Sequence, residues 1–132
     1  MKILAVDFDG VISDSVLKSL FVSHNAYCRY FGPDVKKNFG GQFFTFENWE
    51  QMKQDYHQEI EKYRRLRSYI ELSGDFFAII RIIEEQVPVK NQEEFIKLRN
   101  QMDFDYRFFH DLFFREKEWW QNKDFKKWFF LS

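Results

Sequence analysis

The sequence predicts an α/β protein in which one buried strand precedes a predominantly helical region. Residues 3–6, Ile-Leu-Ala-Val, form a continuous apolar run typical of a strand buried on both faces of a parallel sheet. Further along the chain, apolar residues recur every three or four positions, as they do along amphipathic helices. Aromatic residues make up 21% of the chain, with 18 Phe against 5 Gly and 2 Pro. So many rings with so few breakers favour helices packed through aromatic faces over a turn-rich β fold.

The composition restricts the class of protein. A chain of 132 residues is long enough for one domain with a hydrophobic core. Its 20 basic and 21 acidic residues leave a net charge of −1, so we expect neither nucleic acid nor a membrane as a partner. The single cysteine, Cys28, excludes an intrachain disulfide and a cysteine-based zinc site. The apolar run 3–6 is too short for a signal peptide, and no segment has the length of a membrane span, which indicates a cytoplasmic protein.

The first half of the chain after the strand predicts one helix, a loop and a long helical stripe. Gly32-Pro33 ends the first helix, whose apolar face consists of Leu17, Leu20, Phe21, Tyr27, Cys28 and Phe31. A loop covers residues 34–46, with Gly40-Gly41 as its flexible point and three anchoring rings, Phe43, Phe44 and Phe46. The stripe from Trp49 to Ile70 has the strongest helical periodicity, and we expect it to be core.

Local start and stop signals predict the remaining helices. Ser73-Gly74-Asp75 is expected to cap an apolar helix from about residue 76 to 87, which Pro88 breaks. Asn91 is expected to cap the next helix, and Asp124 a last turn through Trp128. A helical region between these two caps carries Phe109, Leu112, Phe113 and Trp120 on its inner face.

A second strand is hard to find. The weak candidates, residues 68–72 and 87–90, lack a clean pattern. Because a lone parallel strand cannot satisfy its backbone groups, its partners must come from the rest of a sheet or from another chain. We therefore expect the 132 residues to be the N-terminal portion of a longer protein.

The segment after the predicted strand carries the chemistry. It reads Asp7-Phe8-Asp9-Gly10-Val11-Ile12-Ser13-Asp14-Ser15. Carboxylates at the C-terminal end of a buried parallel strand lie where open α/β sheets position their sites. Asp7 can attack an electrophile covalently, while Asp9 can shuttle a proton to and from the leaving group. The backbone amides of Phe8, Asp9 and Gly10 can cradle phosphate oxygens, since glycine permits a close approach.

These residues resemble the first motif of the haloacid-dehalogenase-like (HAD-like) superfamily, a hydrophobic run followed by Asp-x-Asp-x-Thr/Val. The match covers about a tenth of the chain and consists of Asp7, Asp9, Gly10, Val11 and Asp14-Ser15. It looks like the version in phosphatases and phosphomutases whose helical cap is inserted directly after this motif. The resemblance implies a Rossmann-type parent fold. Its first strand and nucleophile motif would be residues 1–15, its helical cap 16–128, and the return toward a missing core 129–132.

The resemblance also implies an activity. Asp7 would become an aspartyl phosphate and bind Mg²⁺, and Asp9 would be the general acid/base and bind the metal through its backbone carbonyl. A phosphate ester needs a proton for its leaving alkoxide and a halide does not, so the carboxylate of Asp9 favours phosphoryl transfer over dehalogenation. We expect a Mg²⁺-dependent phosphoric-monoester hydrolase acting on a small phosphorylated metabolite. The family's later Ser/Thr, Lys and acidic motifs are missing, so these 132 residues alone should be inactive.

Two segments superficially repeat parts of the family pattern. Ser73 and Gly74-Asp75 are spelled like the second and fourth motifs, but a helix follows Ser73 and no buried strand precedes it. Asp103-Phe104-Asp105 repeats the Asp-x-Asp spelling after a polar segment, and we interpret it as a loop or a helix start.

The other polar clusters have structural interpretations. His24 shares the apolar face of the first helix, which favours a satisfied core or boundary histidine. His57 and Glu61 share a helix face, but two residues do not make a metal site. A basic cluster is expected to form a solvated face: Arg64, Arg65 and Arg67. Of the adjacent rings Trp119 and Trp120, one should be partly exposed.

Two alternatives to the enzyme remain open. The chain can be a catalytically incomplete HAD-like protein that binds or regulates without turnover. It can also be a helical interaction domain in which the Asp-x-Asp spelling is accidental. A reading frame that continues through a Lys and an acidic pair would favour the enzyme over both.

Overall fold

The computed structural model describes residues 15–32 and 38–131. Within these ranges every regular element is a helix and no strand is present, so the predicted α/β fold class is wrong. The described part of the chain is an all-helical fold, and residues 3–6, predicted as the strand, lie outside it. The elements are α2 (Ser15–Phe31), the 3₁₀ turn η2 (Asn38–Gly41), α3 (Trp49–Asp55), α4 (His57–Arg67), α5 (Asp75–Glu85), α6 (Gln92–Asn100), α7 (Tyr106–Lys123) and α8 (Phe125–Phe129).

Segment 87–90, one of the two weak strand candidates, forms hydrogen bonds with side chains and, within the described residues, not with another strand. Its carbonyl oxygens accept hydrogen bonds from side chains of α4 instead of from a neighbouring strand. Lys62 Nζ donates to the Val87 carbonyl at 3.0 Å, and Arg65 Nη1 donates to the Val89 carbonyl at 2.6 Å. Two long cationic side chains thus satisfy backbone acceptors that a sheet would otherwise have to satisfy.

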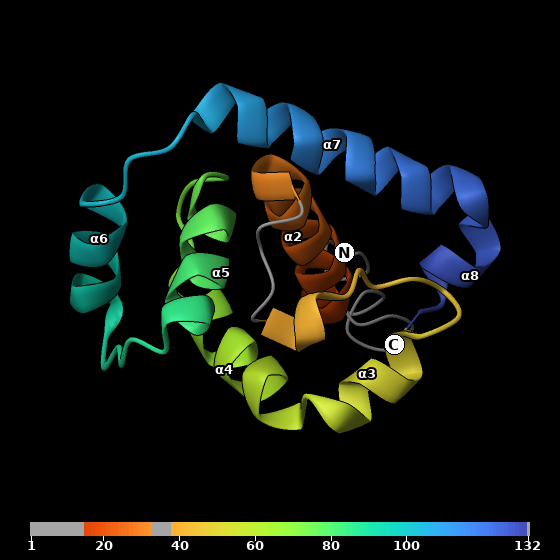
Figure 1. Ribbon diagram of the computed structural model, residues 1–132, viewed down its shortest axis with the longest axis horizontal. Coiled ribbons are helices and arrows are strands. Elements are labelled where there is room, and N and C mark those ends of the chain that lie inside the picture. Colours follow the sequence, from red (N-terminus) through yellow and green to blue (C-terminus); the bar gives the residue numbers. More distant parts are fainter. Residues whose placement is uncertain (1–14, 33–37, 132) are drawn as a thin grey trace, which may run out of the picture.

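Helix α2 lies at the centre of the fold (Figure 1). It packs against α7 on one side, against α5 beside it and against α4 on the opposite side. Helix α6 is outermost and contacts α5, whereas α8 continues from the end of α7 (Figure 1). Among these helices, none combines the length and the apolar character needed to cross a membrane.

The helix ends follow the predicted local signals. Gly32 adopts a φ of 72° directly after α2, a conformation that glycine adopts without steric cost. The Asn91 side chain accepts a hydrogen bond from the Glu94 backbone N–H, and Asp124 accepts one from the Lys127 N–H, so both predicted caps are confirmed. At the start of α5, by contrast, the predicted cap at Ser73-Gly74-Asp75 is wrong, because the N-cap residue is Gly74 and no side chain caps the helix there.

The long stripe from Trp49 to Ile70 is divided between two helices. Tyr56 separates α3 from α4 with φ −118° and ψ 38°, a conformation outside the helical region. The apolar spacing continues across this break, and Met52, Ile60 and Tyr63 are buried. Periodicity therefore identified the core face but not the break.

Aromatic rings fill the core around α2, as the composition predicted. Phe21 stacks on Phe44 with ring centroids 4.5 Å apart, and on Trp120 at 5.5 Å. Phe46 meets Trp120 edge to face at 4.7 Å. These contacts fix the loop after η2 to both α2 and α7, which confirms the anchoring role predicted for its phenylalanines.

Candidate functional site

The four residues predicted to carry the chemistry, Asp7, Phe8, Asp9 and Gly10, lie outside the described residues. Their position along the chain relates them to the described residues. Asp9 precedes Ser15, the first residue of α2, by six positions. The start of α2 is therefore the described segment nearest in sequence to this motif.

A pocket of about 350 Å³ opens at the start of α2. Helix α2 lines it with Ser15, Lys18, Ser19 and Val22, whose spacing of i, i+3, i+4 and i+7 puts them on one helical face. The remaining lining residues come from three other helices: Phe76 of α5, Phe113 and Lys117 of α7, and Trp128 of α8. Four helices therefore build one site.

Two lysines give the pocket its charge. Lys18 Nζ donates to the Phe129 carbonyl at 3.2 Å and lies 5.4 Å from the centroid of the Trp128 ring, so it ties α2 to the C-terminal helix. Lys117 is exposed and lies 5.9 Å from the Phe114 ring centroid. Among the described residues that line the pocket, none is acidic. The lining therefore carries two positive charges and favours an anionic ligand.

The wall of the pocket is apolar and well supported. Phe76 and Phe113 stack with centroids 5.0 Å apart and an interplanar angle of 28°. The Arg67 guanidinium lies over the Phe76 ring, 5.4 Å from its centroid, in a cation–π contact. Trp128 is 6% exposed and packs against Trp120 at 5.3 Å. These rings offer a fixed surface on which a flat ligand could stack.

Two hydroxyl groups complete the lining. The Ser19 hydroxyl donates to the Val16 carbonyl at 2.8 Å and shares a hydrogen bond with the Tyr63 hydroxyl at 2.8 Å. Burial raises the pKa of Tyr63 to about 12, so this phenol stays protonated at neutral pH. Ser15 is exposed at the first position of α2.

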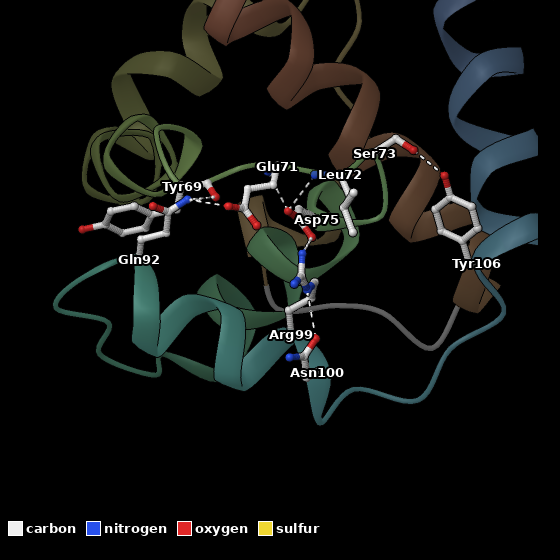
Figure 2. Close-up of polar contacts among 9 residues, drawn as sticks. All are labelled: Tyr69, Glu71, Leu72, Ser73, Asp75, Gln92, Arg99, Asn100 and Tyr106. Carbon is white, nitrogen blue, oxygen red and sulfur yellow. Dashed lines mark hydrogen bonds and ion pairs between the residues drawn. The ribbon is translucent and has the colours of Figure 1, made fainter.

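Ser73 and Asp75, spelled like later family motifs, support the fold (Figure 2). The fully buried Asp75 carboxylate accepts hydrogen bonds from the backbone N–H groups of Glu71 at 2.8 Å and Leu72 at 3.0 Å. Its other oxygen pairs with Arg99 Nη1 at 2.8 Å. The Ser73 hydroxyl is hydrogen-bonded to the Tyr106 hydroxyl. Because both Asp75 oxygens already have partners, this carboxylate is a structural group that joins α5 to α6.

The repeated Asp-x-Asp spelling at residues 103–105 is a helix start, as interpreted from the sequence. Asp105 Oδ1 accepts a hydrogen bond from the Phe108 backbone N–H at 3.0 Å and caps α7. Asp103 is exposed in the preceding loop. These two carboxylates therefore belong to a local capping arrangement.

The histidines also have the structural roles expected of them. His24 is buried, and its Nε2 donates to the Gln42 carbonyl at 2.8 Å. Burial lowers its pKa to about 4, so the ring is neutral at physiological pH. His57 Nε2 lies 4.0 Å from Glu61 Oε2, with both side chains exposed. Across residues 15–32 and 38–131, no group of three or more potential metal ligands is found.

The basic cluster of α4 is less solvated than predicted. Arg65 binds the Val89 carbonyl, Arg67 lies over Phe76, and Arg64 pairs with Glu61 at 3.8 Å. All three side chains therefore contact other parts of the protein, two of them across to a neighbouring element. This cluster strengthens the packing of α4 against α5 and the segment that follows it.

Comparison with known proteins identifies no relative: no family model, curated protein or solved structure matches this chain. The candidate site therefore depends on the chemistry of its own residues. Sequence reasoning did not single out Lys18 or Lys117 as site residues. Only the spacing of positions 15, 18, 19 and 22 signalled a second, partly polar face of α2.

Proposed function

We propose that this protein is a Mg²⁺-dependent phosphoric-monoester hydrolase acting on a small phosphorylated metabolite. The observation that supports this proposal best is that the Asp7–Gly10 motif closely precedes the pocket-lining helix α2 in the sequence. The segment Asp7-Phe8-Asp9-Gly10, which resembles the HAD-like nucleophile motif, leads within a few residues into the face of α2 that lines a cationic pocket. A phosphate monoester carries a charge of about −1.5 to −2 at pH 7, which such a pocket attracts.

In the proposed reaction Asp7 is the nucleophile. Its carboxylate oxygen attacks phosphorus, the ester P–O bond breaks, and Asp9 gives its proton to the departing alkoxide. Asp9 then takes a proton from a water molecule as that water attacks the aspartyl phosphate. Inorganic phosphate leaves and the Asp7 carboxylate is regenerated.

The donor set of the motif suits Mg²⁺, which prefers oxygen ligands. The Asp7 carboxylate and the Asp9 backbone carbonyl would hold the ion. When bound, Mg²⁺ supplies positive charge that offsets the charge of the phosphoryl oxygens. Asp75 and Asp105 are held in structural hydrogen bonds, so they do not complete the metal site. We therefore propose that a different carboxylate completes it and, as the resemblance implies, that these 132 residues alone are inactive.

The helices have a separate role in this proposal. Residues 16–128 act as a helical cap that binds the organic part of the substrate, through the pocket between α2, α5, α7 and α8. A phosphorylated metabolite is an intracellular substrate, and the only cysteine, Cys28, is a buried free thiol. Both points support a cytoplasmic location.

The test is Mg²⁺-dependent release of phosphate from a panel of small esters. It compares the 132-residue chain with the full natural product of its gene. We expect turnover only from the full product, abolition by Asp7→Asn, and a slowed reaction with Asp9→Asn that is least severe for esters with good leaving groups. The matched control is Asp111→Asn, an exposed carboxylate of α7, which should be fully active. Equal activity of Asp7→Asn and the parent would exclude the aspartyl-phosphate route.

A second candidate is a binding protein without turnover. Six large aromatic side chains on or next to α7 and α8 are between 42% and 66% exposed: Tyr106, Phe108, Phe114, Trp119, Phe125 and Phe130. Exposed aromatic side chains are enriched at interaction surfaces. A full-length product that binds phosphate esters but releases no phosphate would favour this candidate.

A further inference from the structure

We propose that the pocket between α2, α5, α7 and α8 binds a small aromatic anion, a flat ring that carries a phosphate or carboxylate group. As a statement about the substrate, this inference rests on the proposed function: the aromatic ring would belong to the alcohol that leaves when the phosphate ester is hydrolysed. As a statement about binding, it concerns only the described residues. The two can therefore fail separately.

The size of the pocket suits a ligand of this kind. Its volume of about 350 Å³ lies at the lower end of the 300–1,000 Å³ range typical of small-molecule sites. A site of that size holds one or two rings but not a nucleotide with its full phosphate chain. The size therefore favours compact ligands.

The apolar side of the pocket selects for a ring. Phe76 and Phe113 both line the pocket and stack on each other with ring centroids 5.0 Å apart at 28°, so together they form one aromatic patch. Trp128 and Val22 also line the pocket but are only 6% and 2% exposed, so the aromatic patch of Phe76 and Phe113 is its main apolar surface. The packing of Arg67 over Phe76 and of Trp120 against Trp128 fixes two of these rings from behind. Because these side chains are already ordered, stacking a ring on them contributes to the binding free energy without the entropic cost of ordering them.

The polar side of the pocket selects for an anion. Lys18 is held in place by the Phe129 carbonyl, and Lys117 approaches from α7. Among the ion pairs of the described residues, none includes Lys117, which lies 5.9 Å from the Phe114 ring centroid. Ser15 adds an exposed hydroxyl group on the α2 side, whereas the Ser19 hydroxyl already donates to the Val16 carbonyl. A doubly charged phosphate should therefore bind better than a singly charged carboxylate, and both better than an uncharged ring.

The experiment measures binding to the 132-residue chain by isothermal titration calorimetry in EDTA, so that no turnover interferes. The probes are phenyl phosphate, benzoate, uncharged benzyl alcohol and inorganic phosphate. We expect affinity to fall in the order phenyl phosphate, benzoate, benzyl alcohol, with inorganic phosphate weaker than phenyl phosphate. Benzyl alcohol binding as tightly as phenyl phosphate would overturn the anionic part of the proposal. Inorganic phosphate binding equally well would overturn the aromatic part.

Variants locate the site. Lys117→Gln should weaken phenyl phosphate about three- to tenfold, as expected for one charge pair at a partly exposed position. The control Lys97→Gln, an exposed lysine on α6, should leave affinity unchanged. Phe76→Leu should weaken both ring anions severalfold while leaving inorganic phosphate unaffected, and far-UV circular dichroism checks that each variant folds. Identical affinities for Lys117→Gln, Phe76→Leu and the parent would overturn the proposal.

Hydrolysis by the full natural product separates this inference from the proposed function. Binding of phenyl phosphate that depends on Lys117, without any turnover, would support the pocket and refute the hydrolase. Turnover of phenyl phosphate whose KM is unchanged by Lys117→Gln would support the hydrolase and refute this pocket as its substrate site.

Discussion

Two buried carboxylates hold the described fold together, and they do so in different ways. Asp75 belongs to the α5–α6 corner, which consists of Asp75, Arg99 and the turn at 71–72 (Figure 2). Glu116 belongs to the α2–α7 seam, where it meets Asn25, Arg29 and Trp120. Each carboxylate is almost fully buried and each pairs with an arginine, at 2.8 Å and 2.9 Å.

The difference lies in where the hydrogen-bond partners come from. Asp75 accepts from backbone N–H groups three and four residues earlier, and its arginine side chain is 16% exposed. Glu116 accepts from the Asn25 amide and the Arg29 guanidinium, 91 and 87 residues away, and from the indole of Trp120 on its own helix. Arg29 is 50% exposed. The corner is therefore mostly local and dry, whereas the seam is long-range and partly hydrated.

The comparison predicts that removing Asp75 is the most damaging single change. Asp75→Ala leaves the Arg99 charge unpaired in a site that water reaches poorly and orphans two backbone N–H groups. We expect a loss of about 3–5 kcal/mol in the free energy of unfolding, measured by urea denaturation at pH 7. The control Asp103→Ala removes an exposed carboxylate from the loop before α7 and should change stability by less than about 0.5 kcal/mol. A loss below about 1 kcal/mol for Asp75→Ala would contradict the assignment of Asp75 as a structural group.

Removing Glu116 should cost less, because Arg29 can regain water. Glu116→Ala leaves the Trp120 indole N–H without a partner, while the Asn25 amide keeps its bond to the Phe44 carbonyl. We expect a loss of about 2–3 kcal/mol in the free energy of unfolding. A double-mutant cycle sharpens the comparison: the coupling between Arg29 and Glu116 should be about 1 kcal/mol or less, and that between Arg99 and Asp75 clearly larger. Equal couplings would mean that exposure of the arginine is not what distinguishes the two regions.

A third prediction uses pH to test how α2 holds the loop after η2, through His24, which donates to the Gln42 carbonyl. Burial lowers the pKa of His24 from 6.5 to about 4 in the folded state, so between these values the unfolded chain binds a proton that the folded chain does not. Stability from this group is complete above pH 6.5 and falls as the pH drops toward 4. At pH 5 the loss should be about 2 kcal/mol.

The measurement for His24 is the free energy of unfolding from pH 7.5 down to pH 5. In His24→Gln this part of the pH dependence should disappear, although the variant is less stable at pH 7.5. His57→Gln, which removes an exposed histidine of α4, should keep the full slope. Parallel curves for the parent and His24→Gln would show that the buried histidine is not the group that titrates.

The same division between local and long-range contacts decides what the sequence could predict. The caps at Asn91 and Asp124 and the helix end at Gly32 depend on neighbours within four residues, and the sequence predicted all three correctly. The α/β class is wrong because the described residues contain only helices, and residues 3–6, on which that prediction depended, lie outside them. The weak strand candidate at 87–90 depended on contacts that are not local. Whether segment 87–90 pairs with a strand depends on Lys62 and Arg65 reaching it from α4, which no local pattern reveals.

The candidate site shows the same limit. The Asp7–Asp9 spelling is local and could be recognised in the sequence, although its geometry lies outside the described residues. The pocket could not be recognised, because Lys18 and Lys117 come together only when α2 packs against α7. Spacing along one helix identifies a face, and only the packing of helices identifies what that face encloses.

The smallest expected effect comes from removing one helix cap in each region, which tests whether the α5–α6 corner and the α2–α7 seam also differ in the stability of their helix ends. Asn91 caps α6 at the corner, accepting from the Glu94 N–H at 2.9 Å, and Asp105 caps α7 of the seam, accepting from the Phe108 N–H at 3.0 Å. Both bonds are exposed, and both span three residues. Alanine at either position removes one capping acceptor and should therefore cost about 1 kcal/mol of unfolding free energy, with a few tenths more for Asp105 because its charge faces the helix dipole. A difference above about 1 kcal/mol between the two variants, measured by urea denaturation, would mean that the helices themselves, and not only their buried side-chain partners, distinguish the corner from the seam.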